Sequence, residues 1–196
     1  MRQHQRSTIM LRRLIDAAME LERRTMHLYC LFESQFSETD ELRTFWFDMA
    51  QHESRHFGAL ALVAGLLDSA SKRRLRMTPS LTRARIDHLR RLLSGFHAEA
   101  ARGVTLERAF EIALAIEGSE VEDVVLDLLQ NLKGEAERER AVKLLIHDLG
   151  DLSYMIEKHT HDHELLERAD ELLEKQVGRL RPKPMRPPRT LRRVKG

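Results

Sequence analysis

The sequence predicts an all-helical protein, a four-helix bundle in which one long crossover joins two pairs of helices. Three observations lead to this expectation. Leu, Ala, Glu and Arg are frequent, whereas aromatic residues make up only 5% of the 196 residues, a composition that favours helices over strands. Apolar residues recur at helical spacing over four long segments. These segments form two pairs separated by a basic stretch that contains Pro79, which is the order of a bundle with one crossover.

The first pair of helices is expected over about residues 7–35 and 40–67. Ser7 or Thr8 can cap the first helix, and the segment SETD at 37–40 supplies a turn and a capping-box-like start for the second. Their apolar faces are Leu11, Leu14, Ile15, Ala18, Met26 and Tyr29 on the first helix, and Phe45, Trp46, Met49, Phe57, Leu60 and Val63 on the second.

The crossover is expected over about residues 68–103, with one short amphipathic helix in the segment LTRARIDHLRRLLSGFHAEAA. Thr105 can cap a third helix that runs to about Leu132, and Gly134 separates it from a fourth that ends near His161. The next segment, HELLERADELLEKQV, predicts a continuation of the fourth helix or a short C-terminal helix.

Residues 1–178 are expected to form one domain, followed by a basic tail at 179–196. The tail holds eight of the 33 Lys and Arg residues, four of the five prolines and no acidic residue, which leaves 25 basic and 31 acidic residues for the domain. We expect the tail to be extended or disordered. Its role is either a solubilising extension or a non-specific charge contact with an acidic partner or a nucleic acid.

The composition excludes several kinds of site. Cys30 is the only cysteine, so neither an intramolecular disulfide nor a CxxC metal module can form, and we expect Cys30 to be a small buried apolar residue. No Gly-rich phosphate loop, nucleophile elbow or Cys/His dyad occurs, which argues against nucleotide hydrolysis and acyl transfer. Since no signal peptide and no long uncharged apolar run is apparent, we expect a cytoplasmic protein that does not span a membrane.

The first pair of helices carries acidic residues in the middle of its apolar stripes. At 100° per residue, Glu22 falls within about 40° of Leu11, Ile15, Ala18, Met26 and Tyr29. Glu53 has the same position on the second helix, and His56 follows three residues later on the same stripe. The second helix therefore predicts an inward-facing ExxH motif.

The second pair of helices repeats this arrangement. Glu117 lies in the apolar stripe of the third predicted helix, with Glu120 three residues later. Asp148 lies in the apolar stripe of the fourth, with Asp151 three residues later. The step from Glu22 to Glu53 is 31 residues, and so is the step from Glu117 to Asp148. The two halves are thus offset by 95 residues at both positions, as an internal duplication predicts.

Acidic residues gathered in one buried layer require a neutralising charge, because burying a single uncompensated carboxylate costs several kcal/mol. Two divalent cations meet this need, and helical bundles bind such a pair with one Glu from each of two helices and an ExxH motif from each of the other two. Taken singly, each acid also fits a salt bridge between helices or a partly solvated end of the bundle.

Three segments, AMELERRTMHLY at 18–29, AQHESRHFGAL at 50–60 and AIEGSEVEDVV at 115–125, resemble the ferritin-like superfamily and within it the rubrerythrin-type domains. The resemblance extends over about residues 8–163. It implies a bundle that binds two iron ions, which dioxygen or peroxide oxidises and which an electron donor that the sequence does not identify reduces again. We also expect a homo-oligomer, most simply a dimer. The ligands that the resemblance implies are Glu22, Glu53, His56, Glu117, Asp148 and Asp151, with Tyr29 and Glu120 beside them.

The sequence departs from the family pattern in the second half. Asp148 and Asp151 stand where the family has Glu and His, so one of two expected imidazoles is absent. His147 is next to Asp148, but helix geometry directs it away from the stripe. Val124 replaces an expected tyrosine, and Glu120 is a candidate to replace the missing ligand. So many oxygen ligands suit manganese as well as iron.

Three interpretations follow. The first is a rubrerythrin-like protein with a di-iron or di-manganese site for iron handling or for oxygen and peroxide chemistry; as an enzyme it would be a peroxidase-like or ferroxidase-like oxidoreductase. The second is a ferritin-like scaffold that has lost its metal and acts as an interaction or regulatory module. The third is a di-iron hydroxylase acting on a nucleic acid, with the basic tail supplying affinity.

Overall fold

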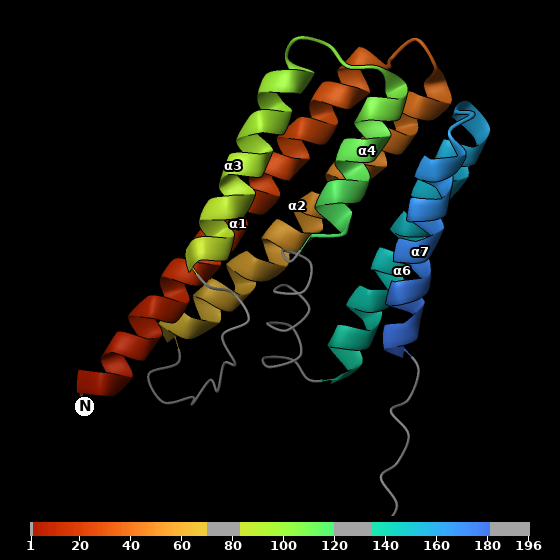
Figure 1. The fold of residues 1–196 in the computed structure, drawn as a ribbon. Helices are drawn as coiled ribbons and strands as arrows, with labels where there is room; N and C mark the ends of the chain where they lie inside the picture. Colours follow the sequence, from red (N-terminus) through yellow and green to blue (C-terminus); the bar gives the residue numbers. More distant parts are fainter. Residues whose placement is uncertain (1, 70–82, 120–134, 181–196) are drawn as a thin grey trace, which may run out of the picture.

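The computed structural model describes residues 2–69, 83–119 and 135–180, which form helices joined by short connections (Figure 1). No strand occurs in these residues, so the predicted all-helical class is confirmed. No helix among them is long and apolar enough to cross a membrane. The helices are α1 (Arg2–Gln35), α2 (Asp40–Ser69), α3 (Arg83–Ala100), α4 (Leu106–Glu117), α6 (Glu135–His159) and α7 (His163–Leu180). The basic tail expected at 179–196 lies almost entirely outside the described residues.

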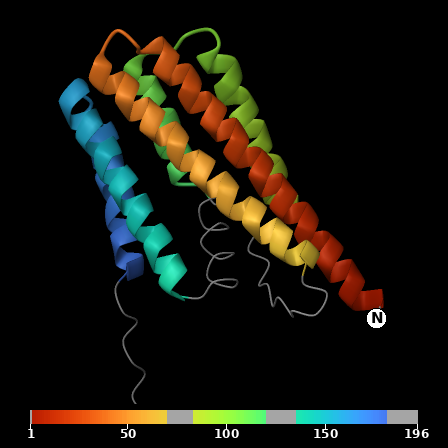
Figure 2. The ribbon, with the colours of Figure 1, turned by 180° about the vertical axis from the view of Figure 1, so that it is seen from behind.

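Helices α1 and α2 form a long hairpin, which Figure 2 shows from behind. The turn between them is short: Phe36 N–H donates to the Phe32 carbonyl at 2.9 Å, and α2 begins at Asp40 with two acidic residues in its first turn. Acidic side chains at that end complement the positive end of the helix dipole. The predicted starts and ends of this pair agree with the structure to within a few residues, apart from the earlier start of α1.

Helix α3 lies within the segment 81–101 where the sequence predicts the crossover helix, and it packs along α1. Arg90 of α3 forms an ion pair with Glu20, and Arg24 donates to Ser94 at 2.7 Å. Gly103 then turns the chain with φ of +85°, a conformation that glycine adopts without strain. Thr105 caps α4 as predicted, since its side-chain oxygen accepts from Arg108 N–H at 3.2 Å.

Helix α4 is shorter than the third helix that the sequence predicts. It ends at Glu117, followed by Gly118, whose backbone N–H makes the last helical hydrogen bond to the carbonyl of Leu114 at 3.0 Å. The expected continuation to Leu132 falls mainly on residues 120–134, which lie outside the described part. Gly118 favours an end of the helix here, because glycine is a poor helix former.

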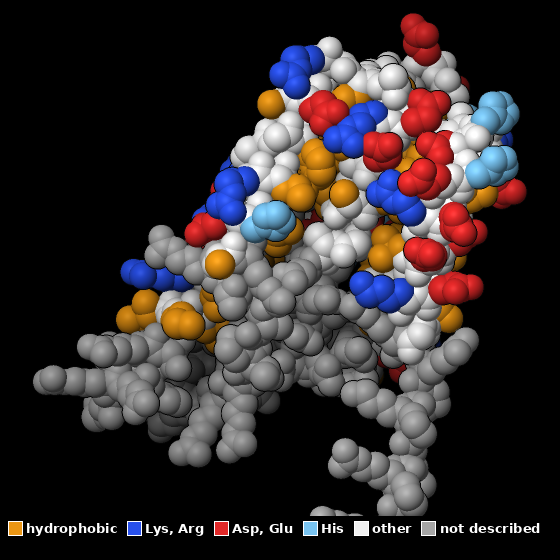
Figure 3. Space-filling model, viewed as in Figure 1, with side chains coloured by type: hydrophobic (Ala, Val, Ile, Leu, Met, Phe, Trp, Pro, Cys, Tyr) orange, Lys and Arg blue, Asp and Glu red, His pale blue; other side chains and the backbone are white. Residues whose placement is uncertain are grey.

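Helices α6 and α7 form a second hairpin, and α4 packs against both of them. Asp162 starts α7 by accepting from Leu165 N–H at 3.0 Å. The C-terminal helix that the sequence suggests is thus a separate element, 18 residues long. Its exposed side carries many acidic residues, which gather over α7 in the space-filling view (Figure 3).

The interior contains two apolar clusters. The larger one centres on Trp46, which lies 4.9 Å from Phe32 and 5.4 Å from Phe110 between ring centroids, and it includes the buried faces of α4 and α6. The smaller one lies further along the α1–α2 hairpin and consists of Leu11, Ile15, Ala17, Ala18, Leu60, Val63, Ala64 and Ile86. Cys30 belongs to neither cluster: it is exposed, so the expectation that it is buried is wrong.

Candidate metal centre

Each of the helices α1, α2, α4 and α6 buries one acidic side chain. Glu22, Glu53, Glu117 and Asp148 are all at most 4% exposed. Helical periodicity predicts these four positions, and their burial confirms that they face the interior. On α2, Glu53 lies between the residues of the larger cluster and those of the smaller one, and on α1, Glu22 follows Leu21, where the larger cluster begins. The two carboxylates are thus buried close to the boundary between the two apolar clusters.

Glu22, Glu53 and His56 come together as a group of ligands, which we call the Glu22–Glu53–His56 triad. One ligand atom from each lies within 4.8 Å of the other two, and it is the only such group of three or more in the residues that the structure describes. His56 Nδ1 is 3.7 Å from Glu22 Oε2 and 3.5 Å from Glu53 Oε2. Glu22 Oε1 and Glu53 Oε2 are buried and accept no hydrogen bond from the described part of the chain.

The ionisation of Glu53 is strongly perturbed in the triad. Burial, reinforced by the neighbouring charge of Glu22, raises the pKa of Glu53 to about 8, against the opposing effect of His56. Glu53 therefore keeps its proton near neutral pH when no cation is present. A bound cation would reverse this preference, because it favours the ionised carboxylate.

Glu117 is held by Tyr29. The Tyr29 hydroxyl donates to Glu117 Oε1 at 2.7 Å, joining α1 to α4 through two buried side chains. Tyr29 is buried, which confirms its predicted place on the apolar face of the first helix. The hydrogen bond fixes one oxygen of Glu117 and so orients the other.

Asp148 is paired with His52, a residue that the sequence interpretation overlooked. His52 Nδ1 lies 2.9 Å from Asp148 Oδ1 across the boundary between α2 and α6. A signal for His52 is present in the sequence: residues 52–56 read HESRH, an HExxH pattern that places two histidines one turn apart on the same side of a helix. The ExxH motif alone begins at Glu53 and therefore does not include His52.

Asp151 does not join the buried acids, which corrects the expectation that it faces inward. Its side chain is 57% exposed, and its Oδ2 lies 3.2 Å from His147 Nδ1. Asp151 lies about 60° from Asp148 around the axis, at the edge of the apolar stripe, where the packing of the neighbouring helix leaves it open to solvent. His147 is 71% exposed and points away from the interior as predicted. Glu120 lies outside the described residues.

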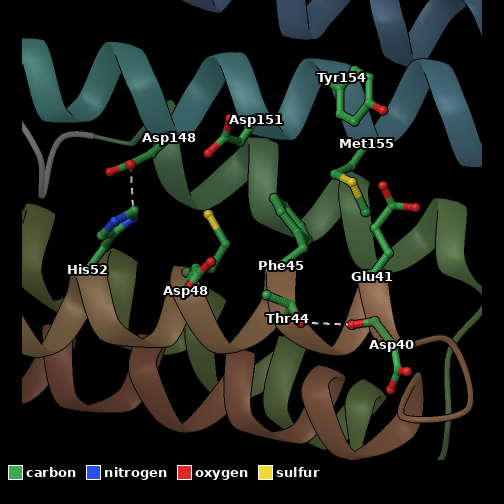
Figure 4. Close-up of a pocket in the computed structure, with 11 residues that line it drawn as sticks. Asp40, Glu41, Thr44, Phe45, Asp48, His52, Asp148, Asp151, Tyr154 and Met155 are labelled. Carbon is green, nitrogen blue, oxygen red and sulfur yellow. Dashed lines mark hydrogen bonds and ion pairs between the residues drawn. The ribbon is translucent and has the colours of Figure 1, made fainter.

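A cleft of about 470 Å³ lies between α2 and α6, with the His52–Asp148 pair at one end (Figure 4). Apolar side chains line part of it, and exposed acidic residues from both helices line the rest. Its lining residues are Asp40, Glu41, Thr44, Phe45, Asp48, Met49, His52, Asp148, Asp151, Tyr154 and Met155. The cleft thus places negative charge beside a partly buried imidazole.

No model of a known protein family, no curated protein and no solved structure matches this chain.

Proposed function

We propose that this chain is a ferritin-like metal-binding protein whose centre is built on the Glu22–Glu53–His56 triad. One observation carries the proposal: three ligand atoms lie within 4.8 Å of one another in the interior, and two of the carboxylate oxygens there have no hydrogen-bond partner among the described residues. A divalent cation would satisfy both oxygens and offset the charge that burial otherwise penalises.

The triad fits a transition metal. Two carboxylates and one imidazole form a mixed oxygen and nitrogen ligand set, which suits iron and manganese. Iron or manganese bound there would supply redox chemistry with dioxygen or peroxide, or would be the cargo in iron handling. Glu117 and Asp148 are the candidates to extend the centre to two ions, because they are buried acids on the two remaining helices of the proposed bundle.

The proposed architecture assigns α1, α2, α4 and α6 to the bundle, α3 to the crossover and α7 to a C-terminal addition. This arrangement is supported by the buried acid on each of the four bundle helices and by the contacts of α2 with α6 and of α4 with α6. The 95-residue offset between Glu22 and Glu117 and between Glu53 and Asp148 agrees with two related halves.

The chain's own residues have defined parts in this chemistry. Glu53 releases its proton when a cation arrives, since the ligand form is the carboxylate. Tyr29 holds Glu117 through a fixed hydrogen bond, which reduces the reorganisation that binding requires. The apolar residues on either side of the triad exclude water, which strengthens its electrostatic interactions.

Elemental analysis of protein loaded anaerobically with Fe²⁺ tests the proposal. We expect about two ions per chain in the wild type, and loss of the triad's ion when Glu53→Ala is combined with His56→Ala. A matched control combines Glu157→Ala with His161→Ala, both at exposed positions, and should leave the metal content unchanged. Wild-type protein that stays free of metal after iron supplementation would end the proposal.

The second candidate function is a ferritin-like scaffold without metal that acts as an interaction module. Two observations favour it: Asp151 has moved out of the buried layer, and Glu117 already has a hydrogen-bond donor in Tyr29. It predicts that Glu22→Gln with Glu117→Gln leaves stability unchanged or raises it, because buried charge is removed. A large loss of iron-dependent stability in this double variant would instead support the metal centre.

A further inference from the structure

The two histidines of α2 face carboxylates that belong to different helices. His56 faces Glu22 of α1, whereas His52, one turn earlier, faces Asp148 of α6. Along the helix axis the two histidines are about 6 Å apart. The arrangement at His56 is thus repeated at His52 with another partner helix.

The contact between His52 and Asp148 is unlike an ordinary ion pair. An imidazolium N–H at 2.9 Å from a carboxylate oxygen normally makes a well-aligned hydrogen bond. Here His52 Nδ1 and Asp148 Oδ1 are both buried, and neither has a hydrogen-bond partner in the described residues. The two atoms therefore lie close together without an aligned donor between them.

Their separation suits two ligands of one ion. Oxygen and nitrogen ligands bind small divalent cations at about 2.1 Å, so two ligands at right angles are about 3 Å apart. The 2.9 Å between His52 Nδ1 and Asp148 Oδ1 is close to this value. Asp148 is 4% exposed, so its charge has little compensation from solvent.

The cleft between α2 and α6 gives this pair a route to solvent. His52 and Asp148 stand at its inner end, and the exposed carboxylates of Asp48 and Asp151 lie along it (Figure 4). Negative side chains beside an opening raise the local concentration of cations. The space also allows water molecules to complete the coordination of an ion that has two protein ligands.

We propose that His52 and Asp148 hold a second divalent transition-metal ion at the inner end of this cleft, with His52 supplying the imidazole that the α6 segment lacks. The inference rests on the proposed metal centre, because it places the second ion of that centre. It differs from the family pattern in taking the second imidazole from α2 instead of the helix that carries Asp148. The ion there is also the more accessible of the two, since the cleft leads to it.

Calorimetric titration with Co²⁺, with visible absorption as a second readout of its coordination, tests this assignment. Wild-type protein, His52→Ala, Asp148→Asn and the Glu53→Ala/His56→Ala double variant are compared, with His88→Ala on the exposed side of α3 as the control. We expect about two ions in the wild type and the control. Both His52→Ala and Asp148→Asn should lose one ion, or at least about tenfold in its affinity, while keeping the other.

The variants separate this inference from the proposed function. If the Glu53→Ala/His56→Ala variant loses one ion and keeps another that depends on His52, the proposed function and the further inference are both supported. A wild type with a single ion that only the double variant abolishes overturns the second position and leaves the proposed function intact. A single ion that every variant abolishes indicates one ion shared by both histidines and also overturns the inference. Circular dichroism of each variant identifies any loss that is due to unfolding, and Asp148→Asn, which preserves shape, provides the test if His52→Ala does not fold.

Discussion

Replacing Glu53 by Gln in metal-free protein should change how folding stability depends on pH. In the folded state the pKa of Glu53 is raised from 4.5 to about 8, chiefly by burial and by Glu22. Between these values the folded chain holds a proton that the unfolded chain has lost. The unfolded state then binds fewer protons, so the free energy of unfolding falls as pH rises.

The size of the expected change in the free energy of unfolding follows from the titration of one proton. Each pH unit within the window changes the free energy of unfolding by about 1.4 kcal/mol, or on the order of 4 kcal/mol between pH 5 and pH 8. This is a large part of the 5–15 kcal/mol that stabilises a typical domain. Because Gln is neutral at every pH, Glu53→Gln resembles the protonated side chain and should remove most of the decline.

Urea unfolding of EDTA-treated protein, followed by circular dichroism at several pH values from 5 to 8, measures this effect. The wild type should lose stability toward pH 8, whereas Glu53→Gln should change much less and become the more stable protein at pH 8. Glu157→Gln, at an exposed position, controls for the loss of a charge as such. Parallel pH profiles for the wild type and Glu53→Gln would refute the account of Glu53 as a strained buried acid.

Three further substitutions test the packing around the site. Tyr29→Phe removes the donor to Glu117 Oε1 and should cost about 1–3 kcal/mol in urea unfolding, whereas Tyr154→Phe at an exposed position should cost little. Trp46→Ala empties the centre of the aromatic cluster and should cost about 3–5 kcal/mol; a loss below 1 kcal/mol would contradict that packing. Gly103→Ala meets no neighbouring atom but forces a side chain to accept φ of +85°, so a loss of about 1 kcal/mol is expected in thermal unfolding.

Helical periodicity accounts for the part of the site that could be predicted from the sequence. Glu22, Glu53, Glu117 and Asp148 lie in the middle of apolar stripes, and a residue in that position is buried whichever helix packs against it. The same argument fails for Asp151, which stands at the edge of its stripe. There the angle between α6 and its neighbour decides exposure, and sequence periodicity does not contain that angle.

Pairing between helices was harder to predict than burial. His52 lies about 100° from Glu53 around α2, so it faces sideways and only the position of α6 brings Asp148 to it. The early end of α4 has a local cause that was available in the sequence, since Gly118 follows Glu117 directly. The predicted continuation to about Leu132 lies mainly outside the described residues.

The charged triad has a consequence for the cooperativity of the α1–α2 hairpin. Apolar packing transmits stability along a helix pair only while it is continuous, and here the buried carboxylates of Glu22 and Glu53 lie close to the boundary between two apolar clusters. In metal-free protein the segment around Ile15 and Leu60 should therefore open on its own, with faster amide hydrogen exchange than the segment around Trp46. A cation bridging the two glutamates would link the two segments, so that they unfold as one unit.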